Sequence, residues 1–135
     1  MKTENINYVK QLGIIADENQ RAADIFGEVS GTKPLDIESL KTNFNAYERA
    51  YDIYKRCKQS LSQVNPPAII NKEHAELVDA YQLFIDSVEI MLSAIDLNKG
   101  THDDELFKQG FEMRVNAVFM AESIGDKVVK KFTNN

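Results

Sequence analysis

Apolar residues recur every three or four positions over most of the chain, which is the spacing of one face of an α-helix. The pattern is clearest in a run whose members step by 3, 4, 3, 4 and 3: Ile37, Leu40, Phe44, Tyr47, Tyr51 and Tyr54. A heptad-type seam of this kind suits a helix that packs at a shallow angle against its neighbours. Asp36 lies directly before the run and is a good N-cap residue, so a helix is predicted to begin there.

The same spacing predicts an earlier helix from about Glu4 to Val29. Its apolar stripe begins at Ile6, Val9 and Leu12, and we expect these side chains to face the core. The stripe weakens near the middle of the segment, where polar residues separate two apolar groups, and it recovers toward the end.

Two further helices are predicted in the second half of the chain. The third begins near Asn71, a good N-cap residue, and is closed by Gly100. Its stripe again steps by three and four: His74, Leu77, Tyr81, Phe84, Val88, Met91 and Ile95. The fourth begins at Thr101, whose spacing to Asp104 approximates a capping box.

The fourth helix has an unusually broad apolar surface. The excess width lies around Phe107, Phe111, Val115 and Val118. A helix that only lined one core would show a narrower stripe. We therefore expect this helix to contact two neighbours or a further subunit.

Helix-breaking residues separate these segments at Gly31 with Pro34, at Pro66 with Pro67, and at Gly100. The connections between them are short, so consecutive helices should run antiparallel. The prediction is an all-α, up-down-up-down antiparallel four-helix bundle that occupies residues 1–135 as one domain. A length of 135 residues is ordinary for one domain.

Composition narrows the classes of function. The chain has 16 Lys and Arg against 21 Asp and Glu, a formal net charge of −5. An acidic balance argues against general nucleic-acid binding and against adsorption to an anionic membrane. The N-terminus carries no apolar run of signal-peptide length, and no stretch approaches the roughly 20 apolar residues of a membrane helix. We expect a cytoplasmic protein, although an exported domain cloned without its signal would look the same.

Motifs for catalysis or metal binding are sparse. The only histidines are His74 and His102, and neither has a Glu three positions before it, as the Glu-x-x-His pairs of di-iron bundles require. We expect His74 to pack at one end of the bundle and His102 to be solvated in the first turn of the fourth helix. Glu73, Glu76 and Asp79 resemble one half of the Mg²⁺ site of all-helical nucleotide pyrophosphohydrolases, which need a second acidic motif on a facing helix. We expect a solvated acidic face, with no metal, cofactor or catalytic residue.

Four tyrosines are the more distinctive feature, namely Tyr47, Tyr51, Tyr54 and Tyr81. Each combines apolar area with a hydroxyl group, so together they could line a ligand pocket or an interface. The alternative is core packing with the hydroxyl groups reaching the surface. We carry these tyrosines forward as ligand or interface candidates, together with the histidine of the third helix and the two phenylalanines of the fourth. Cys57 has no second Cys to pair with, and we expect it to be buried and structural.

One stretch of the sequence resembles small helical proteins of low-GC Gram-positive bacteria. It consists of a Pro-containing turn followed by a helix that opens with His, then Leu and an aromatic residue: Val64-Asn65-Pro66-Pro67-Ala68 and His74-Ala75-Glu76-Leu77-Val78-Asp79-Ala80-Tyr81. Together with the helix that follows, the resemblance covers about half the chain. These families are largely uncharacterised and several are surface lipoproteins, whereas this chain starts at Met1 without a lipoprotein signal. The resemblance implies no catalytic residue.

Three hypotheses of function follow. The first is a non-enzymatic bundle that acts through protein contacts, including self-association through the broad face of the fourth helix. The second is an acidic protein of the immunity or antitoxin type that neutralises a basic partner. The third is a small-molecule or metal-dependent enzyme centred on His74, Glu73, Glu76 and Asp79.

Overall fold

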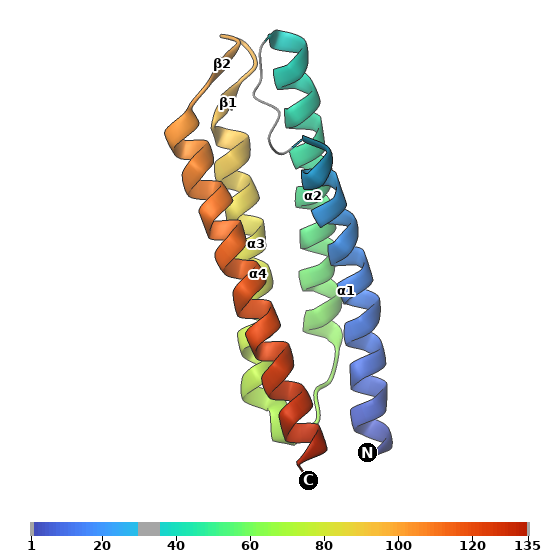
Figure 1. The fold of residues 1–135 in the computed structure, drawn as a ribbon. Coiled ribbons are helices and arrows are strands. Elements are labelled where there is room, and N and C mark those ends of the chain that lie inside the picture. The colour runs from blue at the N-terminus through green and yellow to red at the C-terminus, as the bar shows by residue number, and fades with distance from the viewer. Residues whose placement is uncertain (1, 30–35, 135) are drawn as a thin grey trace.

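Four long helices pack in sequence order and alternate in direction in the computed structural model (Figure 1). The structure describes residues 2–29 and 36–134. The helices are α1 (Thr3–Val29), α2 (Ile37–Gln63), α3 (Asn71–Ser93) and α4 (Asp104–Thr133). Short elements join the later helices: the one-turn helix η1 (Ala68–Ile70) and the two strands β1 (Ile95–Asp96) and β2 (Thr101–His102). The predicted up-down-up-down four-helix bundle is therefore confirmed.

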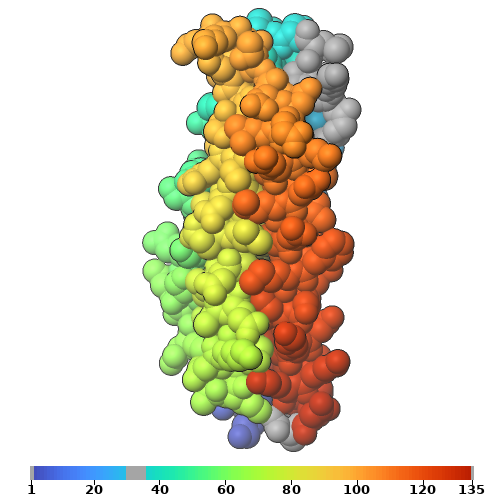
Figure 2. Space-filling model, turned by 90° about the vertical axis from the view of Figure 1, so that its left-hand side faces the viewer, coloured from blue at the N-terminus to red at the C-terminus, as the bar shows by residue number. Residues whose placement is uncertain are grey.

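Close packing follows the order of the chain. α1 packs on α2, α2 on α3 and α3 on α4. Figures 1 and 2 both show α3 and α4 side by side along their length, and Figure 1 shows the two termini at the same end of the bundle. Gly110 permits a close approach between α4 and α3, because a Cβ atom added there would lie 2.7 Å from Cγ of Met91 and 2.8 Å from the carbonyl oxygen of Ser87.

The predicted start of the second helix is confirmed. Asp36 has an extended backbone and its carboxylate accepts a hydrogen bond of 2.8 Å from the backbone N–H of Ser39, as an N-cap residue does. The helix ends at Gln63, shortly before Pro66 and Pro67. Proline has no backbone N–H to donate and restricts the residue before it, so the helix cannot continue there.

Of two other predicted helix boundaries, one lies outside the described residues and one is wrong. The break at Gly31 and Pro34 lies outside the described residues. The prediction that Asn71 caps α3 is wrong, because Asn71 is the first helical residue and Ile70 holds the cap position. The turn of η1 leads directly into α3, which leaves no extended residue between them for a polar cap.

The prediction that the third helix is closed by Gly100 is also wrong, because this helix ends at Ser93. Ile95 instead belongs to β1, which pairs antiparallel with β2. The carboxylate of Asp96 accepts hydrogen bonds from two backbone N–H groups of the following loop, and Gly100 has a φ of 64°. A side chain that bonds its own backbone in this way competes with the helix, and glycine adopts positive φ without strain.

The N-cap of the fourth helix lies two residues after the predicted one. Thr101 is in β2, and the N-cap is Asp103, whose carboxylate accepts a 3.0 Å hydrogen bond from the N–H of Leu106. His102 is therefore not in the first turn of the helix. It is half-buried in β2, with Nδ1 2.8 Å from a carboxylate oxygen of Asp104.

The N-terminal part of α1 is rotated relative to its predicted stripe. Ile6 and Val9 are 40% and 41% exposed, whereas Asn5 and Tyr8 are buried. The prediction that the first two apolar residues face the core is therefore wrong. From Ile15 onward, the predicted apolar face is the buried one.

Candidate functional site

An apolar groove separates α1 from α4. These two helices are not among the closely packed neighbours of the described structure, whereas α1 and α2, α2 and α3, and α3 and α4 are. The space between them measures about 340 Å³ and is lined mainly by apolar and small side chains. We call it the α1–α4 groove; its two helices are blue and orange to red in Figure 1.

Each wall of the groove repeats the helical spacing. The α1 wall includes Leu12, Ala16, Asn19 and Ala23, and the α4 wall includes Arg114, Val118, Ala121 and Gly125. Both sets step by 4, 3 and 4, which is the spacing of a helix seam. The floor comes from α3 and consists of Leu77, Tyr81 and Phe84. The small residues on both walls leave room for a further backbone to come close.

Two aromatic contacts join α1 to α4 on either side of the groove. Toward the termini, the rings of Tyr8 and Phe132 meet edge to face with their centroids 6.1 Å apart. Toward the other end, the guanidinium of Arg114 lies 4.1 Å from the centroid of the Phe26 ring. Arg114 also donates a 2.9 Å hydrogen bond to the hydroxyl of Tyr54, so this cation is engaged inside the bundle.

A buried polar pair lies toward the terminal end of the bundle. The hydroxyl of Tyr8 and Nδ1 of His74 are 2.8 Å apart, and both residues are buried. Burial lowers the pKa of His74, and a backbone hydrogen bond to Leu61 opposes this shift. A neutral imidazole bonded to a backbone carbonyl through one nitrogen can accept from Tyr8 through the other. His74 thus links three helices, as expected of a histidine packed at the bundle's end.

An ion pair lies beside it, in which the Glu73 side chain is buried and the Lys131 side chain is 43% exposed. The carboxylate of Glu73 is 2.9 Å from Nζ of Lys131, and Glu73 is only 5% exposed. The hydrogen bond from Lys131 lowers the pKa of Glu73. The prediction of a solvated acidic face is therefore wrong for Glu73. The sequence pattern could not reveal this ion pair because the paired lysine lies 58 residues away.

The four candidate tyrosines lie in separate environments. Tyr47 and Tyr54 stack on Phe26 with ring centroids 5.6 and 6.3 Å away, in the interior of the bundle. Burial raises the pKa of Tyr47 to about 12. Tyr81 lines the α1–α4 groove, and burial raises its pKa as well. Tyr51 lies on another face, so these residues line no common pocket within the described structure.

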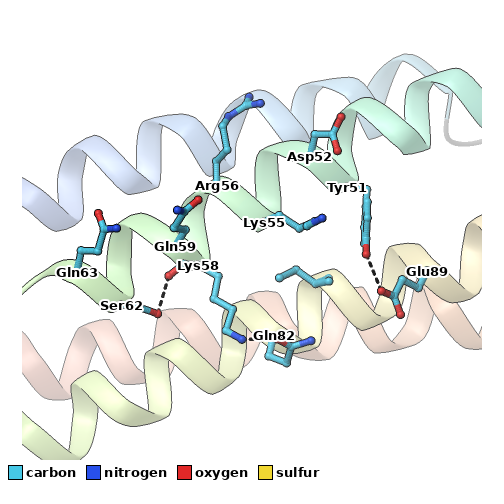
Figure 3. Close-up of a pocket in the computed structure, with 11 residues that line it drawn as sticks. Tyr51, Asp52, Lys55, Arg56, Lys58, Gln59, Ser62, Gln63, Gln82 and Glu89 are labelled. Carbon is cyan, nitrogen blue, oxygen red and sulfur yellow. Dashed lines mark hydrogen bonds between the residues drawn. The ribbon is translucent and has the colours of Figure 1, made fainter.

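The face that carries Tyr51 is polar and lies between α2 and α3. Figure 3 shows the Tyr51 hydroxyl directed at Glu89, to which it donates a 2.6 Å hydrogen bond. It also shows Lys58 directed at Gln82, whose side-chain oxygen lies 2.6 Å from Nζ. Two hydrogen bonds thus join polar side chains of this face across the two helices.

The two candidate phenylalanines of α4 differ in exposure. Phe107 is half-buried and stacks on Tyr47 with a centroid distance of 5.9 Å. Phe111 stacks on the outer side of Phe107 at 6.4 Å and is 40% exposed. Phe107 thus belongs to the aromatic interior, and Phe111 is the one that faces solvent.

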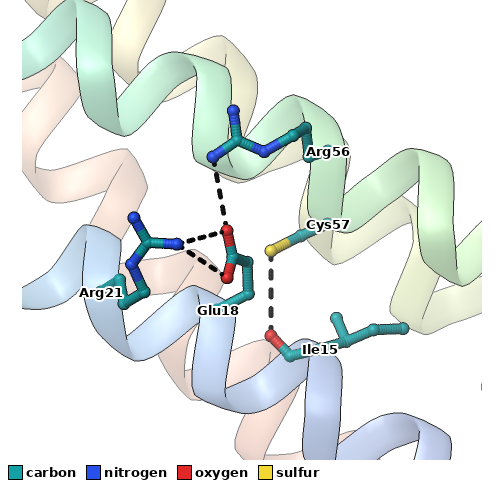
Figure 4. Close-up of polar contacts among 5 residues, drawn as sticks. All are labelled: Ile15, Glu18, Arg21, Arg56 and Cys57. Carbon is teal, nitrogen blue, oxygen red and sulfur yellow. Dashed lines mark hydrogen bonds and ion pairs between the residues drawn. The ribbon is translucent and has the colours of Figure 1, made fainter.

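Cys57 is buried, as predicted. Figure 4 shows its Sγ directed at the backbone oxygen of Ile15, 3.8 Å away. Burial raises its pKa to about 11. The neighbouring Arg56 instead pairs with Glu18, which also binds Arg21. A thiol held in its protonated form is a poor nucleophile.

Over residues 2–29 and 36–134, no three His, Cys, Asp or Glu side chains are placed so as to hold a metal ion together. Among the described helices, none has the length and apolar character needed to span a bilayer.

The fold and the groove together define an all-α four-helix bundle with an apolar groove between its first and last helices. No family model, curated protein or solved structure matches the chain. The resemblance to small helical proteins of Gram-positive bacteria stays a prediction.

Sequence reasoning missed several residues of this site. The contacts at the two ends of the groove involve Tyr8 and Phe26 of α1 and Arg114 of α4. None of these residues was predicted as a site residue. Their contacts join residues far apart in the chain, which spacing cannot reveal. The apolar spacing of α1 did mark Leu12, but it assigned this residue to the core, and only the structure shows that Leu12 lines the groove.

Proposed function

We propose that the protein is a non-enzymatic interaction module whose binding surface is the α1–α4 groove. The observation that carries this proposal is an apolar groove between two helices of a folded bundle. Exposed apolar grooves of this kind are typical of protein–protein contact sites. The enzyme hypothesis depended on His74 and Glu73. His74 is hydrogen-bonded to Tyr8 and Glu73 is paired with Lys131, so neither side chain supports that hypothesis.

A helix is the partner element that fits best. The two walls present seams with the 4, 3, 4 spacing, and a third helix laid between them at a shallow angle would meet both. Binding of an amphipathic helix in an apolar groove is a recurrent mode of peptide recognition. Ala16, Ala23 and Ala121 project little from the walls, so the partner's larger apolar side chains would supply most of the packing.

The test is an NMR titration of the intact protein with a synthetic helical peptide that carries Leu and Ala on one face and charged residues on the other. We expect the amide shifts that change to gather along the α1–α4 groove. Changes that are scattered, or that gather on the polar face between α2 and α3, would overturn the proposal.

A matched pair of variants sharpens the titration. Ala16 is an exposed alanine that lines the groove, and Ala75 is an exposed alanine on α3 that does not. Ala16→Glu places a carboxylate where the partner's apolar face must pack, and should weaken peptide binding by about tenfold or more. Ala75→Glu should leave the affinity unchanged. Equal affinities for the two variants would count against the groove.

A further inference from the structure

The α1–α4 groove contains an Arg side chain whose positive charge is not neutralised inside the molecule. Arg114 is half-buried, its Nε–H donates to the Tyr54 hydroxyl, and its guanidinium lies over the Phe26 ring. Within residues 2–29 and 36–134, its terminal NH₂ groups have no hydrogen-bond acceptor and no carboxylate pairs with them. The terminal fork of a guanidinium fits a carboxylate. Because a half-buried charge without a counter-ion is costly, the free fork is a binding position for a carboxylate from outside the chain.

The described lining of the groove holds one other charged side chain, which has the opposite sign. Glu122 is exposed on the same wall, eight residues after Arg114 and so about 12 Å farther along α4 toward the termini. No Lys or Arg in the described part of the chain pairs with it. Gln20 on the α1 wall, in contrast, donates to Asp24 of its own helix. The lining thus presents one unpaired cation and, two turns away, one unpaired anion.

We propose that the partner helix of the α1–α4 groove carries an Asp or Glu that pairs with Arg114 and, about two turns away, a Lys or Arg that pairs with Glu122. This inference rests on the proposed function of the groove. Since a helix rises about 5.4 Å per turn, side chains about seven or eight residues apart on the partner reach both charges. Between them, the partner's apolar side chains pack against Leu12, Ala16 and Val118.

The two charges fix how the partner lies in the groove. Arg114 is half-buried, so a partner without a carboxylate at this position leaves the guanidinium unpaired in the complex. That loss costs more affinity than the loss of an exposed pair, so Arg114 determines the register. A partner turned end for end would bring like charges together at both positions, and this repulsion excludes the reversed orientation.

The test uses three synthetic helical peptides that share one apolar face and differ only at two positions about eight residues apart. The Glu/Lys peptide has one residue of each charge, the Glu/Glu peptide has two acidic residues, and the Lys/Lys peptide has two basic residues. Fluorescence anisotropy of the labelled peptides measures their affinity for the intact protein.

We expect the Glu/Lys peptide to bind most tightly. The Glu/Glu peptide should bind at least about tenfold more tightly than the Lys/Lys peptide, because it supplies the carboxylate that Arg114 lacks. Non-specific attraction to a chain of net charge −5 would favour the Lys/Lys peptide instead. The order of these two affinities therefore distinguishes pairing at Arg114 from a general effect of charge.

Two exposed residues of α4 provide a matched pair of variants. Glu122→Lys reverses a charge of the groove lining, and Glu112→Lys makes the same change of net charge at a position that does not line the groove. Glu122→Lys should weaken binding of the Glu/Lys peptide by about threefold or more and strengthen binding of the Glu/Glu peptide. Glu112→Lys should leave the ratio of these two affinities unchanged. Circular dichroism melting establishes that both variants are folded.

Arg114→Gln should abolish the preference for the Glu/Glu over the Lys/Lys peptide. This variant also loses contacts to Tyr54 and Phe26, so the order of the peptides on the wild-type chain decides the inference if the variant does not fold. Peptides that bind in the groove by NMR with equal affinity, or a Lys/Lys peptide that binds more tightly than the Glu/Glu peptide, would overturn this inference and leave the proposed function standing. If none of the three peptides binds in the groove, both fail.

Discussion

Replacing Gly110 with Ala should destabilise the bundle, even though Ala is the better helix former. Gly110 lies where α4 crosses α3, and an added Cβ would come within 2.7 Å of the Met91 side chain and 2.8 Å of the Ser87 carbonyl oxygen. The methionine can change rotamer, but the carbonyl belongs to the backbone of α3. One helix must therefore move away from the other.

The magnitude follows from two opposing terms. Gly→Ala in a helix interior gains about 1 kcal/mol from helix propensity. Inserting a methyl group into a packed core costs about 1–3 kcal/mol, and a clash with backbone belongs in the upper part of that range. The expected net loss is about 1–2 kcal/mol. Gly125 is the matched control in the same helix, because no described atom lies within 4 Å of its added Cβ. Gly125→Ala should gain about 1 kcal/mol.

Urea unfolding followed by far-UV circular dichroism measures both variants against the wild type. A difference of about 2–3 kcal/mol between them, with a slope of about 2 kcal/mol per molar urea, separates their midpoints by about 1 M or more. The slope should be the same in all three proteins. If Gly110→Ala were as stable as Gly125→Ala, α4 would not approach α3 as closely as described, and the reasoning would fail.

Three further outcomes are expected. Since burial raises the pKa of Cys57 to about 11, thiol reagents at near-neutral pH should label it slowly in the folded protein and rapidly after denaturant is added. Fast labelling of the folded chain would contradict its burial. Since burial holds the pKa of His74 below its ordinary 6.5, the folded chain binds fewer protons than the unfolded one, and the free energy of unfolding should fall as the pH drops below 6.5. His74→Gln should remove that dependence, which urea titrations at several pH values would measure. Lys131→Met, which strips Glu73 of its ion-pair partner, should lower the melting temperature more than Lys130→Met in the same turn, and equal melting temperatures would refute a stabilising role for the pair.

The helices were predictable because their signals are local. The apolar spacing of α2, the cap at Asp36 and the stop at Pro66 all act within a few residues of where they stand, and the structure agrees with each. The pair formed by Tyr8 and His74 joins positions 66 residues apart. Its existence depends on how the helices assemble, so it could not be read from spacing alone.

The error at the end of α3 has a different origin. Ile95 continues the helical spacing and is 7% exposed, yet it lies in a strand. Apolar spacing reports which side chains are buried, and a buried residue can belong to either element. The turn that ends the helix was readable in principle, because Asp96, Asn98 and Gly100 lie close together in the sequence and all three residue types favour turns.

The error in α1 bears on function. Val9 and Leu12 were assigned to the core because they are apolar and correctly spaced, yet Val9 is 41% exposed and Leu12 lines the α1–α4 groove. The nearby core position is occupied by Tyr8, whose hydroxyl is hydrogen-bonded to His74. An isolated exposed Val needs no explanation. Here, however, it lies one turn before Leu12 in the row that continues to Ala16 on the groove wall. An apolar row that lines a groove and is not buried in the core is expected where a surface binds a partner. If the groove binds a further helix, as proposed, Val9 should become protected from solvent in the complex, which hydrogen exchange of its backbone amide would measure.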